Sequence, residues 1–140
     1  MRLFVDTEFN GFGGELLSMA VVSEDGREWY ETLPLPEDIN PWVAEHVVPL
    51  LGREPLAPNE WRRSLHRFLR QFDNPEVVAD WYTDLVHFFN SMAGRDHTES
   101  FTFACRSSLV LLDNYASEQP HNALSDARAI RDALVYREAA

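Results

Sequence analysis

The stretch Arg2–Phe9, which reads RLFVDTEF, decides the fold. Its residues alternate between the two faces of an expected β-strand, and Asp6 and Glu8 fall on the same face. Two residues of a strand cover about 7 Å, a spacing at which two carboxylates can bridge and flank a pair of divalent cations. A solvent-facing pair of acids is the alternative for this pattern taken alone. Because the strand is flanked by apolar runs, we expect it to be central, where unpaired carboxylates are costly and need a cation.

Two further strands should follow directly, at residues 16–22 (LLSMAVV) and 28–33 (EWYETL). Asp25-Gly26 between them favours a tight antiparallel hairpin. The proline-rich stretch 33–58 should be mostly irregular, with one short helix that begins after Asn40 and has Pro41 at its first position.

The second half of the chain should alternate helices with strands. Its apolar spacing predicts helices at residues 59–72, 82–93, 107–117 and 122–137, and strands at residues 76–80 and 101–105. Three strands followed by this alternation favour a mixed α/β sheet of five strands flanked by helices. A chain of 140 residues fits one domain with one sizeable core.

Chemistry-bearing residues return in two later segments, Asp84 in ADWYTDL and both His121 and Asp126 in HNALSDA. If the last helix begins at about Asn122, Asp126 lies on its second turn and His121 just outside its N-terminus. His121 could then swing over the same site. Taken singly, His121 could be a turn histidine and Asp126 an exposed helix acid, but the combined string is more specific than either.

These motifs resemble those of the DEDD 3′–5′ exonucleases, a superfamily with a DnaQ-like, RNase H-like fold. VDTEF is similar to its first motif, D-x-E, and HNALSDA to its third motif in the histidine form, H-x(4)-D. The tyrosine subclass would carry Tyr where this chain has Asn122, so the resemblance is to the DEDDh branch. With SEDGREWY in the hairpin, the chain looks closest to compact bacterial exoribonucleases of the RNase AS type. The resemblance covers nearly the whole chain and implies a single exonuclease domain over residues 1–140.

The middle motif departs from the family pattern. Relatives read H-N-A-x-x-D after a strand, and laying VVADWYTDL on this pattern puts Asp84 on the ligand aspartate. Asp80 then stands where the family has asparagine, and it remains open as an alternative ligand, an outer-sphere ligand or a helix cap. Ala79-Asp80-Trp81 in place of His-Asn-Ala bears on substrate contacts rather than on metal binding.

The resemblance implies two-metal hydrolysis of phosphodiester bonds at the 3′ end of single-stranded RNA, with release of nucleoside 5′-monophosphates. Asp6, Glu8 and Asp126 would hold one ion, and Asp6 and Asp84 the other. His121 would accept the proton of the attacking water as general base. Oxygen ligands and phosphate chemistry favour two Mg²⁺ or Mn²⁺ ions over zinc.

Aromatic side chains near the motifs are candidates for stacking on the terminal bases of a single strand. Phe9 follows Glu8 directly, Phe12 lies in the glycine-bearing loop after it, and Trp81 precedes the middle motif. Glu15 is a candidate polar contact to the end nucleotide. Core packing is the alternative for each aromatic, since such side chains dominate cores.

The net charge of −11 disfavours a protein that grips long duplexes, and all 12 basic residues are arginines. The helix expected at 59–72 has a basic face, which could be a solvated surface, a phosphate track or a dimer surface. Related exoribonucleases often form homodimers, so a homodimer is expected.

There is no stretch of about 18 apolar residues, so no membrane partner is expected. The single cysteine and the absence of a leader-like start indicate a reducing cytoplasm.

Two other functions fit the same sequence. One keeps the chemistry and changes the substrate to DNA, as in a proofreading or repair exonuclease, because only recognition of the 2′-hydroxyl separates RNA from DNA. The other is a catalytically silent RNase H-like interaction module with relic acids. Loss of an acidic residue would favour the silent module, and no residue of the set is missing.

Overall fold

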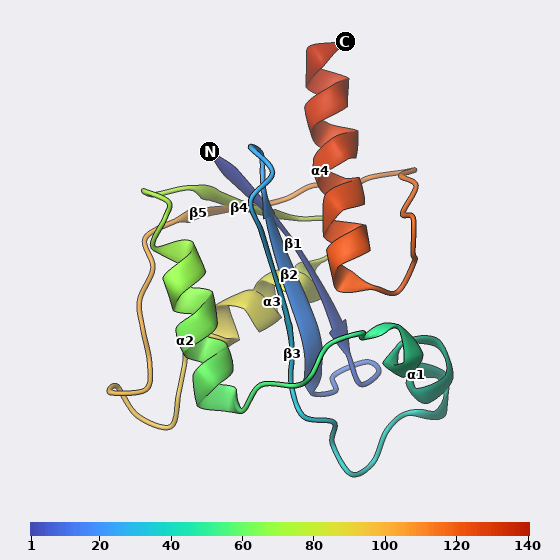
Figure 1. Ribbon diagram of the computed structural model, residues 1–140. Coiled ribbons are helices and arrows are strands. Elements are labelled where there is room, and N and C mark those ends of the chain that lie inside the picture. Colours follow the sequence, from blue (N-terminus) through green and yellow to red (C-terminus); the bar gives the residue numbers. More distant parts are fainter.

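Strand β1 (Arg2–Phe9) lies in the middle of a five-stranded sheet with the order β3-β2-β1-β4-β5 (Figure 1). The computed structural model describes residues 1–140. The antiparallel neighbours β2 (Leu16–Ser23) and β3 (Glu28–Thr32) extend one side, and the parallel neighbours β4 (Glu76–Ala79) and β5 (Arg106–Leu109) extend the other. This mixed sheet has RNase H-like topology, which confirms the expected fold class.

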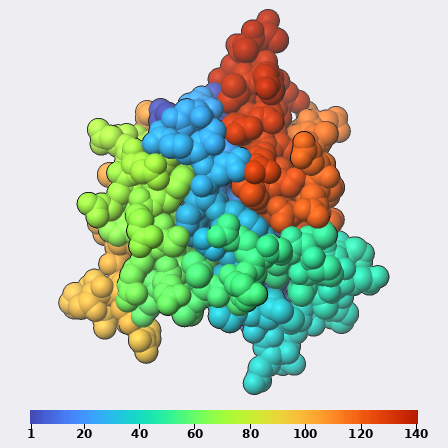
Figure 2. All heavy atoms as spheres, viewed as in Figure 1, coloured from blue at the N-terminus to red at the C-terminus, as the bar shows by residue number.

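The two faces of the sheet are covered by different helices. Helices α2 (Pro58–Leu69) and α3 (Tyr82–Asn90) cover the face that carries Leu3 and Val5, where they build the main core around Trp61, Leu65 and Phe88. Helix α4 (Ala123–Ala139) covers the other face (Figure 1). Figure 2 shows α2 and α4 on either side of the β2–β3 hairpin.

Small side chains bring α4 close to the sheet. Ala123 and Ala127 are fully buried and pack against Ala20 and Val22 of β2. One turn further, Ile130 packs between Phe4 and Val78. These small and branched side chains form a buried stripe along α4, which sets how near the first turn of the helix comes to β1.

The proline-rich stretch is mostly irregular, as expected, and contains α1 (Pro41–His46) followed by the 3₁₀ turn η1 (Val48–Leu50). The side chain of Asn40 accepts hydrogen bonds from the backbone N–H groups of Trp42 and Val43, at 2.9 and 3.3 Å. The cap and the proline at the first helical position confirm the predicted start of this helix.

The segment 101–117 differs from its prediction. Residues 101–105 form no strand, because Phe101 and Phe103 turn onto the main core from an irregular segment. The fifth strand is β5, which pairs with β4 in the register Glu76↔Arg106. No helix forms at 107–117, where β5 gives way to irregular structure. Because β5 is a largely exposed edge strand, its sequence RSSL shows no apolar alternation that could have indicated it.

None of the helices has the length and apolar character needed to cross a membrane.

Replacing Ile130 with alanine should lower the free energy of unfolding by about 2–5 kcal/mol, because it leaves a cavity between α4 and the sheet. Leu111→Ala is the control: Leu111 is 80% exposed, and its loss should change the free energy by no more than about 0.5 kcal/mol. Urea unfolding measures both. Equal effects of the two substitutions would contradict the packing of α4 described here.

Candidate active site

Five acidic side chains from three separated parts of the chain meet at the end of β1. Ligand atoms of Asp6, Glu8 and Asp126 lie within 4.8 Å of one another, and so do those of Asp6, Asp80 and Asp84. Asp6 belongs to both groups. Figure 1 shows that β1 ends near α1 and the first turn of α4, which explains how the distant motifs converge.

The first two acids owe their placement to β1. Asp6 is only 8% exposed because β1 is the central strand and α4 covers this face. The pairing of β1 with β2 shifts register between Glu8 and Phe9. Such an irregularity at the end of a strand re-aims the neighbouring side chains, and here it lies directly beside the acids.

Asp84 is held from the opposite face of the same strand. It lies in the first turn of α3, is 3% exposed, and accepts hydrogen bonds from the backbone N–H and the hydroxyl of Thr7, at 3.1 and 2.5 Å. Asp80 follows β4 directly and is half-buried. The structure therefore places both candidates for the middle ligand beside Asp6, and both stay open.

The first turn of α4 is fixed by Asn122. Its side-chain oxygen accepts from the backbone N–H of Ser125 at 3.1 Å, and its amide donates to the carbonyl of Leu50 at 2.9 Å. The backbone N–H of His121 donates to Asp126 at 3.1 Å. His121 has a φ of 69°, so the chain turns sharply there, and the residue is exposed to solvent.

The imidazole of His121 lies outside both acidic groups. Its ring packs edge-to-face against Trp42 with 5.1 Å between ring centroids, and Trp42 in turn stacks on His46. Asp126 therefore contacts the backbone of His121, while the imidazole ring of His121 lies against Trp42.

The burial and mutual repulsion of these acids disfavour their charged forms in the folded chain. Burial, reinforced by the charges of Asp84 and Glu8, raises the pKa of Asp6 well above its usual range. Burial and the neighbouring Asp126 raise the pKa of Glu8 to about 8. Burial also raises the pKa of Asp84, to about 7, and that of Asp126.

A divalent cation fits this donor set. The Oδ2 atom of Asp6 is buried without a hydrogen-bond partner, and none of the five acids forms a salt bridge. Hard oxygen donors without a competing cation are the ligands that Mg²⁺ and Mn²⁺ prefer.

A hollow of about 380 Å³ adjoins the acids and is lined by Glu8, Phe9, Phe12 and Trp42, among others. Phe12 is 89% exposed and Trp42 50% exposed, so both rings are available to a ligand. Trp42 is not among the contacts predicted from the sequence. Its only signal there is an aromatic residue in the first turn of a short helix, and its proximity to Glu8 arises from tertiary structure alone.

The other two candidate contacts lie outside this hollow. Trp81 is 53% exposed and immediately precedes α3, next to Asp80 in sequence. The carboxylate of Glu15 accepts a hydrogen bond from the Asn10 amide at 3.0 Å on the surface.

In chelator, the protein should lose stability as the pH rises from about 5 to about 8. In the folded state Asp84 keeps its proton up to a pH of about 7 and Glu8 up to about 8, whereas in the unfolded state both have lost their protons above about pH 5, so rising pH favours unfolding. A fixed Mn²⁺ concentration of about 100 times the Kd at pH 8 should restore about 2.7 kcal/mol at pH 8, and less at pH 5, where protons compete with the ion for the acids. Thermal unfolding with and without Mn²⁺ checks this; equal stabilisation at both pH values would contradict it.

Comparison with known proteins agrees with these motifs. No protein-family model matches the chain. Two curated proteins of Mycobacterium tuberculosis, the 3′-5′ exoribonuclease Rv2179c of strain H37Rv and the 3′-5′ exoribonuclease MT2234.1 of strain CDC 1551, are each 42% identical to it over 91 residues. The match covers 58% of this chain and 52% of each relative, so the chain spans about half the length of the curated relatives it matches. With its RNase H-like sheet, this chain is a homologue of these mycobacterial 3′–5′ exoribonucleases.

Proposed function

We propose that this chain is a metal-dependent 3′–5′ exoribonuclease that releases nucleoside 5′-monophosphates from the 3′ end of single-stranded RNA. The observation that carries the proposal is the pair of acidic groups that share the buried Asp6, in a chain homologous to 3′–5′ exoribonucleases. Asp6, Glu8 and Asp126 would hold one Mg²⁺ or Mn²⁺ ion, and Asp6 with Asp84, Asp80 or both would hold a second. Such ions supply Lewis-acid activation of water and charge stabilisation of the leaving oxygen.

The residues of the chain itself divide the remaining work. His121 is exposed to solvent. Rotation of its side chain would bring the imidazole over the acids, where it would accept the proton of the attacking water. Its backbone bond to Asp126 ties the position of this histidine to that of a ligand. Thr7 holds Asp84 by two hydrogen bonds, so the middle carboxylate enters the site already oriented.

The hollow beside Glu8 suits the terminal base of the substrate. Trp42 and Phe12 offer exposed aromatic faces, and base–aromatic stacking binds single strands without a strict sequence requirement. Because Glu8 lines the same hollow, a base held there would place its adjoining phosphate near the acids. Phe9 also lines this hollow, and the exposed Trp81, next to Asp80 in sequence, would contact the strand beyond it.

Substitution of the acids tests the proposal directly. Asp6→Asn and Asp84→Asn should abolish nucleotide release, and His121→Ala should reduce it by about 10²–10⁴-fold. Asp73→Asn, which changes an exposed acid remote from the site, is the matched control and should retain full activity.

The assay follows 5′-labelled RNA and DNA of one sequence with Mg²⁺ or with chelator. We expect an RNA ladder shortening from the 3′ end; full activity of Asp6→Asn would refute the site, and faster DNA cleavage would change the substrate.

Trp42→Ala should raise the KM for RNA by about tenfold or more, because a stacked base contributes about 1–3 kcal/mol. Trp42→Phe keeps an aromatic face and should recover most of the affinity. Steady-state kinetics of both variants checks this. If alanine and phenylalanine give the same KM as tryptophan, the terminal base lies elsewhere.

The homodimer expected from the resemblance remains a prediction. Light scattering of the purified chain measures its mass in solution, and a monomer at micromolar concentration would contradict it.

A further inference from the structure

Cations without partners gather on one helix of this acidic chain. Four arginines on or directly after α2 form no salt bridge: Arg62, Arg63, Arg67 and Arg70. The only other arginines outside the ion pairs are Arg106 and Arg137. Helix α2 contains a single acid, Glu60, and like charges four residues apart, such as Arg63 and Arg67, destabilise a helix. In a chain with a net charge of −11, this surface is the place where a polyanion meets least repulsion.

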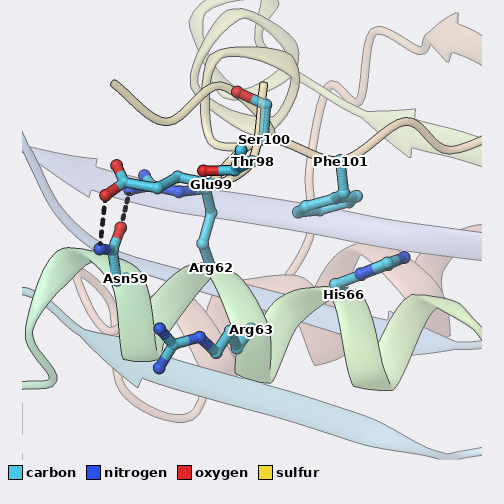
Figure 3. Close-up of a pocket in the computed structure, with 8 residues that line it drawn as sticks. All are labelled: Asn59, Arg62, Arg63, His66, Thr98, Glu99, Ser100 and Phe101. Carbon is cyan, nitrogen blue, oxygen red and sulfur yellow. Dashed lines mark hydrogen bonds between the residues drawn. The ribbon is translucent and has the colours of Figure 1, made fainter. Parts of the chain in front are cut away.

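A hollow of about 360 Å³ lies between α2 and the segment 98–101 (Figure 3). Figure 3 shows Arg62 rising from the helix toward this segment, and the ring of His66 lying parallel to that of Phe101, with centroids 4.3 Å apart. One guanidinium nitrogen of Arg62 donates to Asn59 at 2.6 Å, but its Nε is buried without an acceptor. A buried cationic donor that lacks an acceptor is costly, so the chain itself does not fully satisfy the guanidinium of Arg62. Phosphate oxygens are acceptors that suit a guanidinium group.

The one acid in the wall of this hollow does not cancel its charge. Glu99 accepts hydrogen bonds from Arg95 at 2.9 Å and from Asn59 at 3.1 Å. Its pairing with Arg95 lowers the pKa of Glu99 to about 2, so Glu99 and Arg95 form a neutral pair. Arg62 and Arg63 remain uncompensated.

Arg62 also lines a second hollow, of about 340 Å³. Leu16, Leu33 and Trp61 give this hollow apolar walls, while His87 and Asn90 provide polar groups. A cationic hollow and an apolar hollow that share one arginine suit a ligand with a phosphate next to a flat ring. An unpaired nucleotide has this form, whereas a duplex keeps its bases stacked inside.

We propose that the α2 surface, made of Arg62, Arg63, Arg67, Arg70 and these two hollows, is a second binding surface for single-stranded RNA. Phosphates bind at Arg62 and Arg63, and an unpaired base enters the adjoining apolar hollow. The surface lies on the sheet face that α2 and α3 cover, whereas Asp6 and Glu8 face α4. Its apolar hollow reaches toward the acidic site, because His87 in its wall packs against the ring of Phe9 with 5.0 Å between ring centroids. The inference rests on the proposed function for its choice of RNA, and it implies tighter binding of long strands than of dinucleotides.

Binding of labelled RNA of about 20 nucleotides, measured by fluorescence anisotropy in chelator, tests the proposal without hydrolysis. Arg62→Gln/Arg63→Gln should bind about tenfold or more weakly at low salt, and the slope of log K against log salt should fall by about 1.4, the value for two phosphates of a single strand. Arg106→Gln/Arg137→Gln removes the same charge from other exposed positions and should stay within about twofold of the wild type. An RNA duplex of equal length should compete poorly with the single strand.

Equal losses in the two double variants, no loss in either, or effective competition by the duplex would overturn the proposal. Light scattering covers the remaining case: if Arg62→Gln/Arg63→Gln converts a dimer to a monomer, the surface belongs to a second copy of this chain. Arg63→Gln alone, at an exposed position, repeats the test if the double variant unfolds. Hydrolysis of a dinucleotide with Mn²⁺ should remain within about twofold in all variants. A wild type that cleaves no RNA refutes the proposed function, while the binding comparison still decides the α2 surface.

Discussion

The burial of the Asp6 carboxylate in the central strand is the constraint on which this structure depends. One of its oxygens has no partner, and four further acids lie close by. In a low-dielectric interior such a cluster must keep protons or bind cations, since repulsion and lost hydration otherwise oppose folding. The fold therefore creates a site of strongly negative potential at the end of β1. Divalent cations that bind there could take part in the hydrolysis of phosphodiester bonds.

Both faces of β1 contribute to that point. Thr7 fixes Asp84 from the α3 side, while Asp6 and Glu8 face α4. Two buried alanines let α4 approach, and Asn122 ties its first turn to the carbonyl of Leu50, just after α1. Because α1 also carries Trp42, this hydrogen-bonded junction brings His121, Asp126 and the hollow beside Glu8 into one region. The site is thus built on rigid elements rather than on a single loop.

Strong local patterns made much of this predictable. Local signals in the sequence indicate the alternation in Arg2–Phe9, the Asp-Gly turn, the start of α1 at Pro41 and the last helix. The acidic motifs could be assigned to these elements from the sequence. The prediction of the fifth strand was wrong because an exposed edge strand needs no apolar pattern. The alternating Phe101 and Phe103 resembled a strand pattern, but they pack against the main core from an irregular segment. Trp42, the place of Asp80 beside Asp6 and the hollows around Arg62 depend on contacts between distant segments, which one sequence does not display.

The acidic centre and the cationic α2 surface carry opposite charges on one small domain. The most direct test of the central claim is calorimetric titration of Mn²⁺ into the metal-free chain, in buffers of different ionisation enthalpy. We expect binding of about two ions near neutral pH with release of protons from the buried acids, and loss of the tighter binding event in Asp6→Asn. Absence of binding, or identical titrations of the wild type and Asp6→Asn, would contradict it.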